Sequence, residues 1–393
     1  MAIEKVNGVE NPEQPQGVQV PLPEAEITPG VTELDDGSVI VGEMQQEIQA
    51  TIPVPFDANL AEFIEEGDLG VVSNDLVGAI DDDISSRKDW EEQYKGGLEL
   101  LGMNYEDRAE PFEGASGVVH PLLAESVTQF QAQAYREMLP ASGPVRTHIV
   151  GAESPELLAQ AERVKNYMNY QITYEMEEYD PELDQMLFYL PIVGSAFKKV
   201  YFDPSMQRAV SKFVHAEDLI VPYNATDLRT STRITHVVRM GKNEIRKLQL
   251  QGFYRDIDLP SSDSGGTNYD EVKETIDDIQ GVGKSTSDNE EITLYEIHTD
   301  LDLVGFEDVG QDGEPTGLKM PYVVTIVEKS GEVLSIKRNF NEGDPFRRKI
   351  PYFIHYKFLP GLGFYGFGLT HMIGGLSRAS TSILRQLIDA GTL

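Results

Sequence analysis

The sequence predicts an α+β protein, with helices in roughly residues 85–190 and antiparallel sheet in roughly residues 195–360. Two observations carry this prediction. Apolar residues recur every three or four positions as far as Gly194 and every second position after it, which is the change from helical to strand periodicity. The chain then closes on "GLTHMIGGLSRASTSILRQLID" at 368–389, where the apolar residues return to helical spacing.

Residues 1–55 are predicted to form a disordered acidic arm. The stretch "NPEQPQGVQVPLPEAEITPGVTELDDG" is rich in Pro, Glu, Gln and Gly and has neither helical nor strand period. Residues 1–86 hold 19 acidic side chains and one basic side chain, so about half of the excess negative charge lies here. Between 57 and 84 we expect short helical pieces, with the run "DDD" at 81–83 suited to a helix N-terminus.

The helices of the body are expected from their apolar faces and their start signals. One begins near Ser85 and places Trp90, Tyr94, Leu98 and Leu101 on one face. A second begins near Leu122 and ends before Pro140. For a third, Ser154 is the predicted N-cap and Pro155 the first helical residue, and "DPE" at 180–182 repeats this start for a fourth.

The sheet is expected from segments that alternate between apolar and polar residues. These segments are 195–203, 209–221, 233–240, 291–303, 319–340 and 350–360, with a hairpin turn at "KSG" within 319–340. A short helix is expected at 242–252. Residues 256–291 contain 11 acidic and 2 basic side chains and are predicted to be a mobile insertion with one short helix. The predicted division is therefore an arm at 1–55, an α+β body at 56–360 and a closing segment at 361–393.

Composition narrows the classes of function. The net charge of −34 argues against an ordinary nucleic-acid-binding surface, which needs clustered Lys and Arg. The chain has no cysteine, which excludes disulfides and thiolate metal sites. It has no apolar run of the roughly 18 or more residues expected for a transmembrane helix, and its N-terminus does not have the pattern of a secretory signal.

The motifs that first suggest chemistry do not hold together. "GVGKST" at 281–286 resembles part of a phosphate-binding loop, but Asp278 stands where the first glycine is required and the flanking residues are polar. The seven histidines show no metal-ligand spacing, and neither "GAS" at 114–116 nor "GSA" at 194–196 has the glycines of a nucleophile elbow. We therefore predict no catalytic, cofactor or metal site, and favour a structural or interaction protein over an enzyme.

The closing segment carries a family resemblance. "IPYFIHYKFLPGLGFYGFGLTHMIGGLSRASTSILRQLID" at 350–389 resembles the part of tailed-bacteriophage portal proteins that joins the outer body to the stem. The matching residues are Tyr365, Gly366, Gly368, Leu376, Arg378, Thr381, Leu384, Arg385, Gln386, Leu387 and Asp389. The Asp-Ile-Gln of the family pattern is replaced here by Gly375, Leu376 and Ser377. Upstream, "PFEGASGVVHPLLAESVTQFQAQAYREMLPASGPV" and "LPIVGSAFKKVYFDP" look like the body of a podovirus-type subfamily, so the resemblance covers roughly 85–393.

The resemblance implies a structural subunit without enzymatic activity. Portal subunits form a ring, usually of twelve copies, at one capsid vertex, through which DNA is packaged and ejected. The implied partners are other copies of the chain, the major capsid or scaffolding protein, the terminase and a tail adaptor, while DNA passes without sequence recognition. The implied location is the virion, assembled in the host cytoplasm without a membrane. Residues 56–360 would be the wing-like body and 361–393 the start of a stem helix, whereas the clip, second stem helix and crown of the family have no counterpart in this sequence.

Two alternatives stay open. The chain could be a non-viral binding module or a hydrolase of unknown substrate that shares the strand–helix pattern, and the closing helix could simply pack on its own core. Arg378, Arg385 and Gln386 are the candidate residues for a subunit interface or a channel. At 3.6 residues per turn the two arginines project within about 20° of each other. They could form a basic ring toward a channel or pair with Asp or Glu of a neighbouring subunit, and we favour pairing because Arg suits bidentate carboxylate contacts.

Overall fold

The structure is a computed structural model. It describes residues 31–33, 39–41, 54–103, 112–204, 206–259, 271–281, 291–310 and 314–392. The chain divides into two units, Met1–Val54 and Pro55–Leu393, and each is described by itself. In the first unit β1 (Val31–Glu33) and β2 (Val39–Val41) form a short antiparallel pair that the sequence did not predict. Most other residues of the predicted arm lie outside the described residues, and its disorder stays a prediction.

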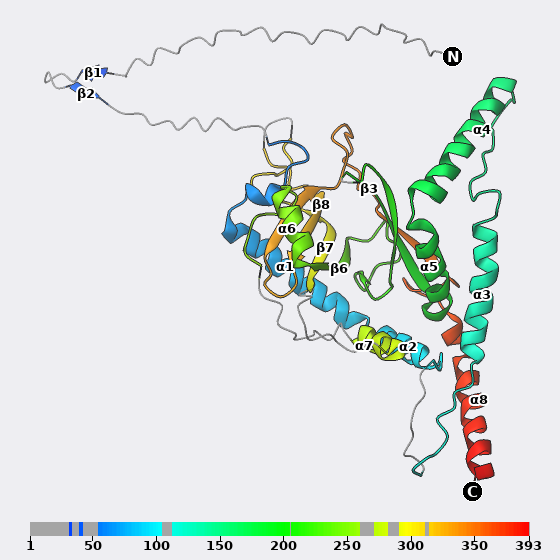
Figure 1. The fold of residues 1–393 in the computed structure, drawn as a ribbon. Helices are drawn as coiled ribbons and strands as arrows, with labels where there is room; N and C mark the ends of the chain where they lie inside the picture. Colours follow the sequence, from blue (N-terminus) through cyan, green and yellow to red (C-terminus); the bar gives the residue numbers. More distant parts are fainter. Residues whose placement is uncertain are drawn as a thin grey trace, which may run out of the picture. The chain divides into compact units, whose positions relative to one another are not determined.

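The second unit confirms the α+β fold (Figure 1). Its helices before the sheets are η1 (Leu60–Glu62), α1 (Glu66–Ser86), α2 (Lys88–Glu99), α3 (Leu122–Met138), α4 (Pro155–Tyr170), the π-helix η2 (Gln171–Glu175) and α5 (Tyr179–Val193). The predicted start of α4 is confirmed, because the Ser154 side chain accepts a hydrogen bond from the Leu157 amide and Pro155 is the first helical residue.

The strands form two separate antiparallel sheets in this unit. The smaller sheet has the order β10 (Phe353–Lys357), β3 (Ser195–Asp203), β4 (Arg208–Val214). The larger has the order β5 (Leu219–Ile220), β6 (Arg233–Gly241), β7 (Glu291–Leu301), β8 (Met320–Val327), β9 (Val333–Arg338). The remaining helices are α6 (Lys242–Leu250), α7 (Glu271–Gln280) and α8 (Leu369–Thr392). Every pairing between these strands is antiparallel, as the alternating segments predicted.

The main core lies where α2 and α5 meet the sheets. Tyr94, Leu98 and Leu101 of the predicted α2 face are buried in it, together with Phe197 of β3 and Phe353 of β10. Trp90, the remaining residue of that face, stacks on Tyr365 with ring centroids 4.2 Å apart. Among the described residues, none of the helices is both long and apolar enough to cross a membrane.

Gly194 links the helical half to the sheets and fixes where α8 begins. It caps α5 with φ +89°, a left-handed conformation that favours glycine. A Cβ built on Gly194 would lie 2.5 Å from the Gly366 carbonyl oxygen, and one built on Gly366 would lie 2.4 Å from the Gly194 carbonyl oxygen. The two backbones are therefore in direct contact. Beside them, the Gly366 amide donates to Ser195 Oγ at 2.8 Å and Thr370 Oγ1 donates to the Ile192 carbonyl at 2.8 Å, so the first turn of α8 is held against the end of α5.

Side chains occupy outward-facing hydrogen-bonding groups at two sheet edges. Along β4, Glu182 Oε2 accepts from the Phe213 amide at 2.6 Å and Glu178 Oε1 from the Ser211 amide at 3.4 Å. Along β9, Asn59 Oδ1 accepts from the Ile336 amide at 3.0 Å and Asn59 Nδ2 donates to the Leu334 carbonyl at 3.0 Å. Such contacts remove the backbone groups through which an edge strand would recruit another chain.

Two expectations need correction. The prediction of short helical pieces at 57–84 is wrong for most of that range, because α1 is one helix of 21 residues. The acidic run 81–83 lies in its C-terminal part and not at an N-terminus. Asp83 is buried there, and Arg233 Nε donates to its carboxylate at 3.0 Å, a pairing that offsets the unfavourable end of the helix dipole.

In the predicted mobile insertion, α7 packs Val272, Ile276 and Ile279 against the main core. The described part of the insertion is therefore not a solvated linker. Residues 260–270 and 282–290, including most of the "GVGKST" stretch, lie outside the described residues.

Candidate interaction site

The closing helix α8 has three faces with different surroundings. One face packs on its own chain, against α3, α5 and α2. Its residues include Ile373, Gly374, Ser377 and Thr381, which are small or polar with the exception of Ile373. Thr381 accepts a hydrogen bond from the His120 amide at 3.0 Å through its hydroxyl oxygen. The closest approach is to α2, where a Cβ on Gly97 would lie 2.7 Å from Thr370 Oγ1.

The second face, which we call the α8 stripe, is apolar and points outward. It consists of Met372, Leu376, Ile383 and Leu387, which are 60%, 61%, 59% and 67% exposed. Their separations of four, seven and four residues keep them on one line along the helix. Ser377 and Thr381, by contrast, are only 0% and 8% exposed. The distribution is thus the reverse of that expected for a helix that packs only on its own core, where the large apolar residues would face inward.

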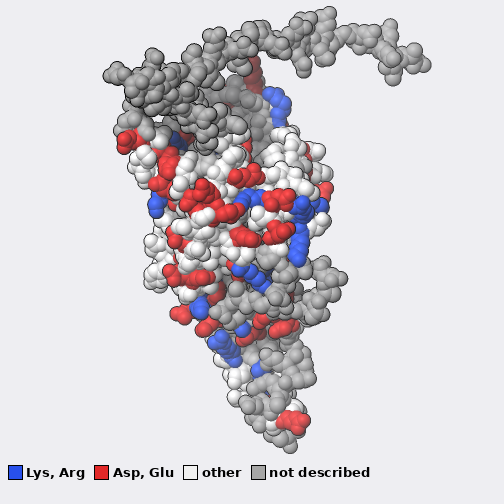
Figure 2. Space-filling model, turned by 90° about the vertical axis from the view of Figure 1, so that its left-hand side faces the viewer, with Lys and Arg blue, Asp and Glu red and all other residues white. Residues whose placement is uncertain are grey.

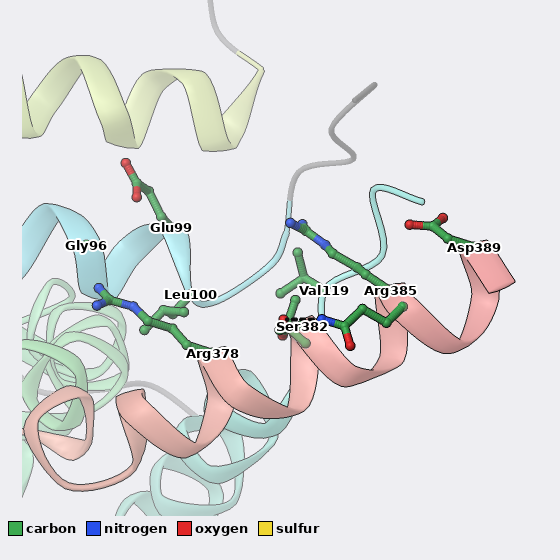
Figure 3. A pocket seen from close by; sticks show the side chains of 10 residues that line it. Gly96, Glu99, Leu100, Val119, Arg378, Ser382, Arg385 and Asp389 are labelled. Carbon is green, nitrogen blue, oxygen red and sulfur yellow. Dashed lines mark hydrogen bonds between the residues drawn. The ribbon is translucent and has the colours of Figure 1, made fainter. Parts of the chain in front are cut away.

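The third face is polar and borders a pocket of about 420 Å³. The pocket is lined by Gly96, Glu99, Leu100, Val119, Arg378, Thr381, Ser382, Arg385, Gln386 and Asp389. All three candidate residues from the sequence, Arg378, Arg385 and Gln386, therefore border one pocket. In Figure 3 the Arg378 side chain extends toward α2 and Gly96, whereas Arg385 extends toward the segment that carries Val119.

Arg385 and Asp389 attach this face to the loop before α3. Arg385 Nε donates to the Val118 carbonyl at 2.7 Å and Arg385 Nη2 to the Gly117 carbonyl at 3.3 Å. Asp389 Oδ1 accepts from the Ser116 amide at 2.7 Å. The Arg385 guanidinium is thus used within its own chain. Its predicted contact with a neighbouring carboxylate or a channel stays a prediction.

Arg378 and Gln386 are both exposed. Gln386 Nε2 donates to Ser382 Oγ at 3.4 Å, a contact within α8. The Arg378 guanidinium lies beside α2, since a Cβ on Gly96 would be 3.1 Å from its Nη2 atom. Arg378 therefore remains the better placed of the two arginines for a carboxylate brought by a partner.

The main concentration of buried charge lies elsewhere, between the two sheets. Lys199 Nζ of β3 donates to both carboxylate oxygens of Glu296 on β7, each at 2.6 Å. His298 Nε2 is 2.8 Å from the same carboxylate. Burial lowers the pKa of His298, and that of the nearby His236 to about 4, so both rings are neutral at pH 7. Within the described ranges no group of three or more metal-ligating side chains could hold an ion.

The sequence identified α8 but not the direction of its faces. Periodicity gives the angle between residues, and it does not say which side is covered by the rest of the chain. A second exposed helix, α4, was missed for the same reason. Its start was predicted correctly, yet none of its residues is buried.

Searches against known proteins return no match for this chain: no protein-family model fits it, and no curated protein is significantly similar to it. The resemblance to portal proteins therefore rests on the residues of the chain itself.

Proposed function

We propose that this chain is a portal subunit, a structural protein that forms a ring at a capsid vertex through which viral DNA is packaged and ejected. The observation that carries the proposal is the reversed exposure of α8. Its large apolar residues form the exposed α8 stripe, while Ser377 and Thr381 face the chain itself. This helix directly follows the "GFYGFG" segment, the position at which the portal resemblance places the start of a stem.

An exposed stripe of this kind favours association with another protein, because covering it removes apolar surface from water. A second copy of the chain is the partner that a ring requires. Cyclic rings are built from heterologous contacts, in which one face of a subunit meets a different face of the next. The three faces of α8 satisfy this need for asymmetry, because the stripe and the pocket with Arg378 lie on different sides of one helix.

The charge distribution is compatible with a DNA channel that does not bind tightly. On the face seen in Figure 2, Asp and Glu are spread over the described surface with Lys and Arg scattered among them, and no basic stripe runs across it. A net charge of −34 repels phosphate, and release of counterions from DNA needs clustered basic side chains. DNA would pass such a ring without sequence recognition. Terminase, a tail adaptor and the capsid or scaffolding protein are the further partners under this proposal, with the virion as location.

The test is the oligomeric state of the purified chain and of variants on two faces of α8. We expect the wild type to form closed rings in mass photometry and electron microscopy, and the double variant Leu376→Glu/Ile383→Glu to remain monomeric. The matched control, Ser382→Glu/Gln386→Glu, adds the same charges on the pocket face and should still assemble, with circular dichroism verifying that all three proteins fold.

A wild type that stays monomeric at every concentration and turns over an ester, glycoside or nucleotide would overturn the proposal and favour the hydrolase alternative. Rings formed equally well by wild type and stripe variant would show that α8 does not hold the subunits together.

A further inference from the structure

The helix α4 and the π-helix η2 form a second exposed surface, which we call the arm (residues 155–175). Its large apolar residues are mostly in contact with solvent. Seven of them are exposed: Leu157, Leu158, Val164, Tyr167, Met168, Tyr170 and Tyr174. No residue of α4 or of η2 is buried.

The contacts of α4 within the chain are few and polar. Asn169 Oδ1 accepts from the Val145 amide at 2.9 Å, Asn169 Nδ2 donates to the Val145 carbonyl at 3.2 Å, and Thr147 Oγ1 donates to the Ala161 carbonyl at 3.2 Å. These bonds hold one side of the helix on the segment that precedes it. An isolated helix of about 12–15 residues is marginal in water, and helices in proteins gain most of their stability from packing an apolar face. A 16-residue helix without a buried residue therefore lacks its main source of stability in the single chain.

The area of the α8 stripe also requires a continuation. A half-exposed large side chain presents roughly 100 Å², since aromatic side chains bury about 150–250 Å² in full. The four residues of the stripe then offer about 400 Å², whereas a stable interface buries about 800 Å² on each partner. The seven residues of the arm would add about 700 Å². Figure 1 shows α4, α3 and α8 following one another along one side of this unit, so a partner covering α8 can continue onto the arm.

The charges of the two surfaces indicate what covers them. The arm contains three acidic and two basic residues, and α8 contains one acidic and two basic residues. Together they carry no net charge in a chain of −34. Copies of so acidic a protein repel one another, and a neutral surface is where they can approach at least cost. The same surface has no excess of positive charge with which to attract DNA.

We infer that the arm is an assembly arm that packs on a second copy of this chain, as the continuation of the interface begun by the α8 stripe. This inference rests on the proposed ring. In a single copy the arm is only weakly stabilised, and association with the neighbour completes its packing.

The experiment compares charge substitutions on two sides of α4 in the full chain. The double variant Val164→Glu/Tyr167→Glu places charges within the apolar surface of the arm. The matched control, Asn166→Glu/Thr173→Glu, places the same charges at exposed polar positions of the same arm. We expect the first variant to raise the concentration needed for half assembly at least tenfold, and the control to change it less than threefold, by mass photometry.

Hydrogen exchange provides a readout that does not depend on any arm variant. Amides of 155–175 should exchange at least tenfold more slowly in the wild-type ring than in the Leu376→Glu/Ile383→Glu monomer. If arm variants assemble like the wild type and exchange in the arm is unchanged by assembly, the inference is wrong while the ring stands. Arm variants that form normal rings but no longer join capsid or scaffolding protein would assign the arm to a different partner and also overturn it. A wild type that never assembles overturns both proposals.

Discussion

At the residue scale, the main core contains a carboxyl group that folding keeps protonated. Glu217 is buried between α2 and β5, next to the hydroxyl of Tyr94. Burial raises the pKa of Glu217 to about 8 from an ordinary value of 4.5, because the charged form is poorly solvated there. The backbone around it is held by Arg87, which donates to the Glu217 carbonyl at 2.6 Å and to the Leu219 carbonyl at 3.0 Å.

This raised pKa predicts a pH-dependent gain from Glu217→Gln. Below pH 4.5 both the folded and unfolded states hold the proton, and the group has no pH-dependent effect. Between pH 4.5 and 8 only the folded state holds it, so the free energy of unfolding of the wild type falls relative to that of the variant as pH rises. We expect the variant to be more stable by on the order of 2 kcal/mol at pH 7 and equal to the wild type at pH 4, in urea unfolding. A difference that is the same at both pH values would contradict a buried neutral carboxyl.

At the scale of elements, the sequence located most helices and strands but not the contacts that orient them. The starts of α4 and β3 follow from local chemistry, since Ser154 and Pro155 form a cap and Gly194 permits a left-handed turn. The single long α1 was not predicted, because its acidic run resembles a helix start until Arg233, 150 residues away in the sequence, provides a partner for Asp83. The faces of α8 could not be assigned either, since only the packing of α3, α5 and α2 decides which side is covered. Propensity and periodicity are local, and these outcomes depend on long-range contacts.

The attachment of α8 to the loop before α3 leads to a prediction at this scale. Arg385→Ala removes the two bonds to the carbonyls of Gly117 and Val118 and should lower the free energy of unfolding by about 1–2 kcal/mol. It should also speed hydrogen exchange of the amides at 116–120, which lie against α8. The neighbouring Gln386→Ala, whose only described bond is within α8, should change the free energy of unfolding by less than about 0.5 kcal/mol. If the two variants behave alike, the Arg385 contacts do not stabilise the loop.

At the scale of the whole second unit, the two sheets are joined by a buried ion pair. Lys199 comes from the three-stranded sheet and Glu296 from the five-stranded sheet, and their side chains are 14% and 20% exposed. Removing one partner of such a pair leaves the other charge buried, which costs more than the pair contributes in the intact protein. The pair therefore specifies how the sheets meet more than it adds to stability.

A double-mutant cycle tests this role. Lys199→Met should lower the free energy of unfolding by about 3 kcal/mol or more, because the Glu296 carboxylate loses its cation. Adding Glu296→Gln to that variant removes the unpaired charge and keeps a side-chain oxygen near His298, so it should restore at least half of the loss. Purely additive effects in thermal unfolding would show that the two residues do not act as a pair.

The carboxylates that occupy the β4 edge and the Asn59 amide that occupies the β9 edge have a consequence for the kinetics of assembly. A chain added to a sheet by backbone pairing forms many cooperative hydrogen bonds and leaves slowly, which would trap a subunit joined in the wrong register. With these edges occupied, copies of this chain can meet there only through side-chain surfaces. Contacts of that kind dissociate quickly when they are incomplete, since affinity differences between related interfaces reside mainly in the off-rate. A misplaced subunit would then leave before the next one arrives, and errors in a growing ring would be corrected by release instead of being built in.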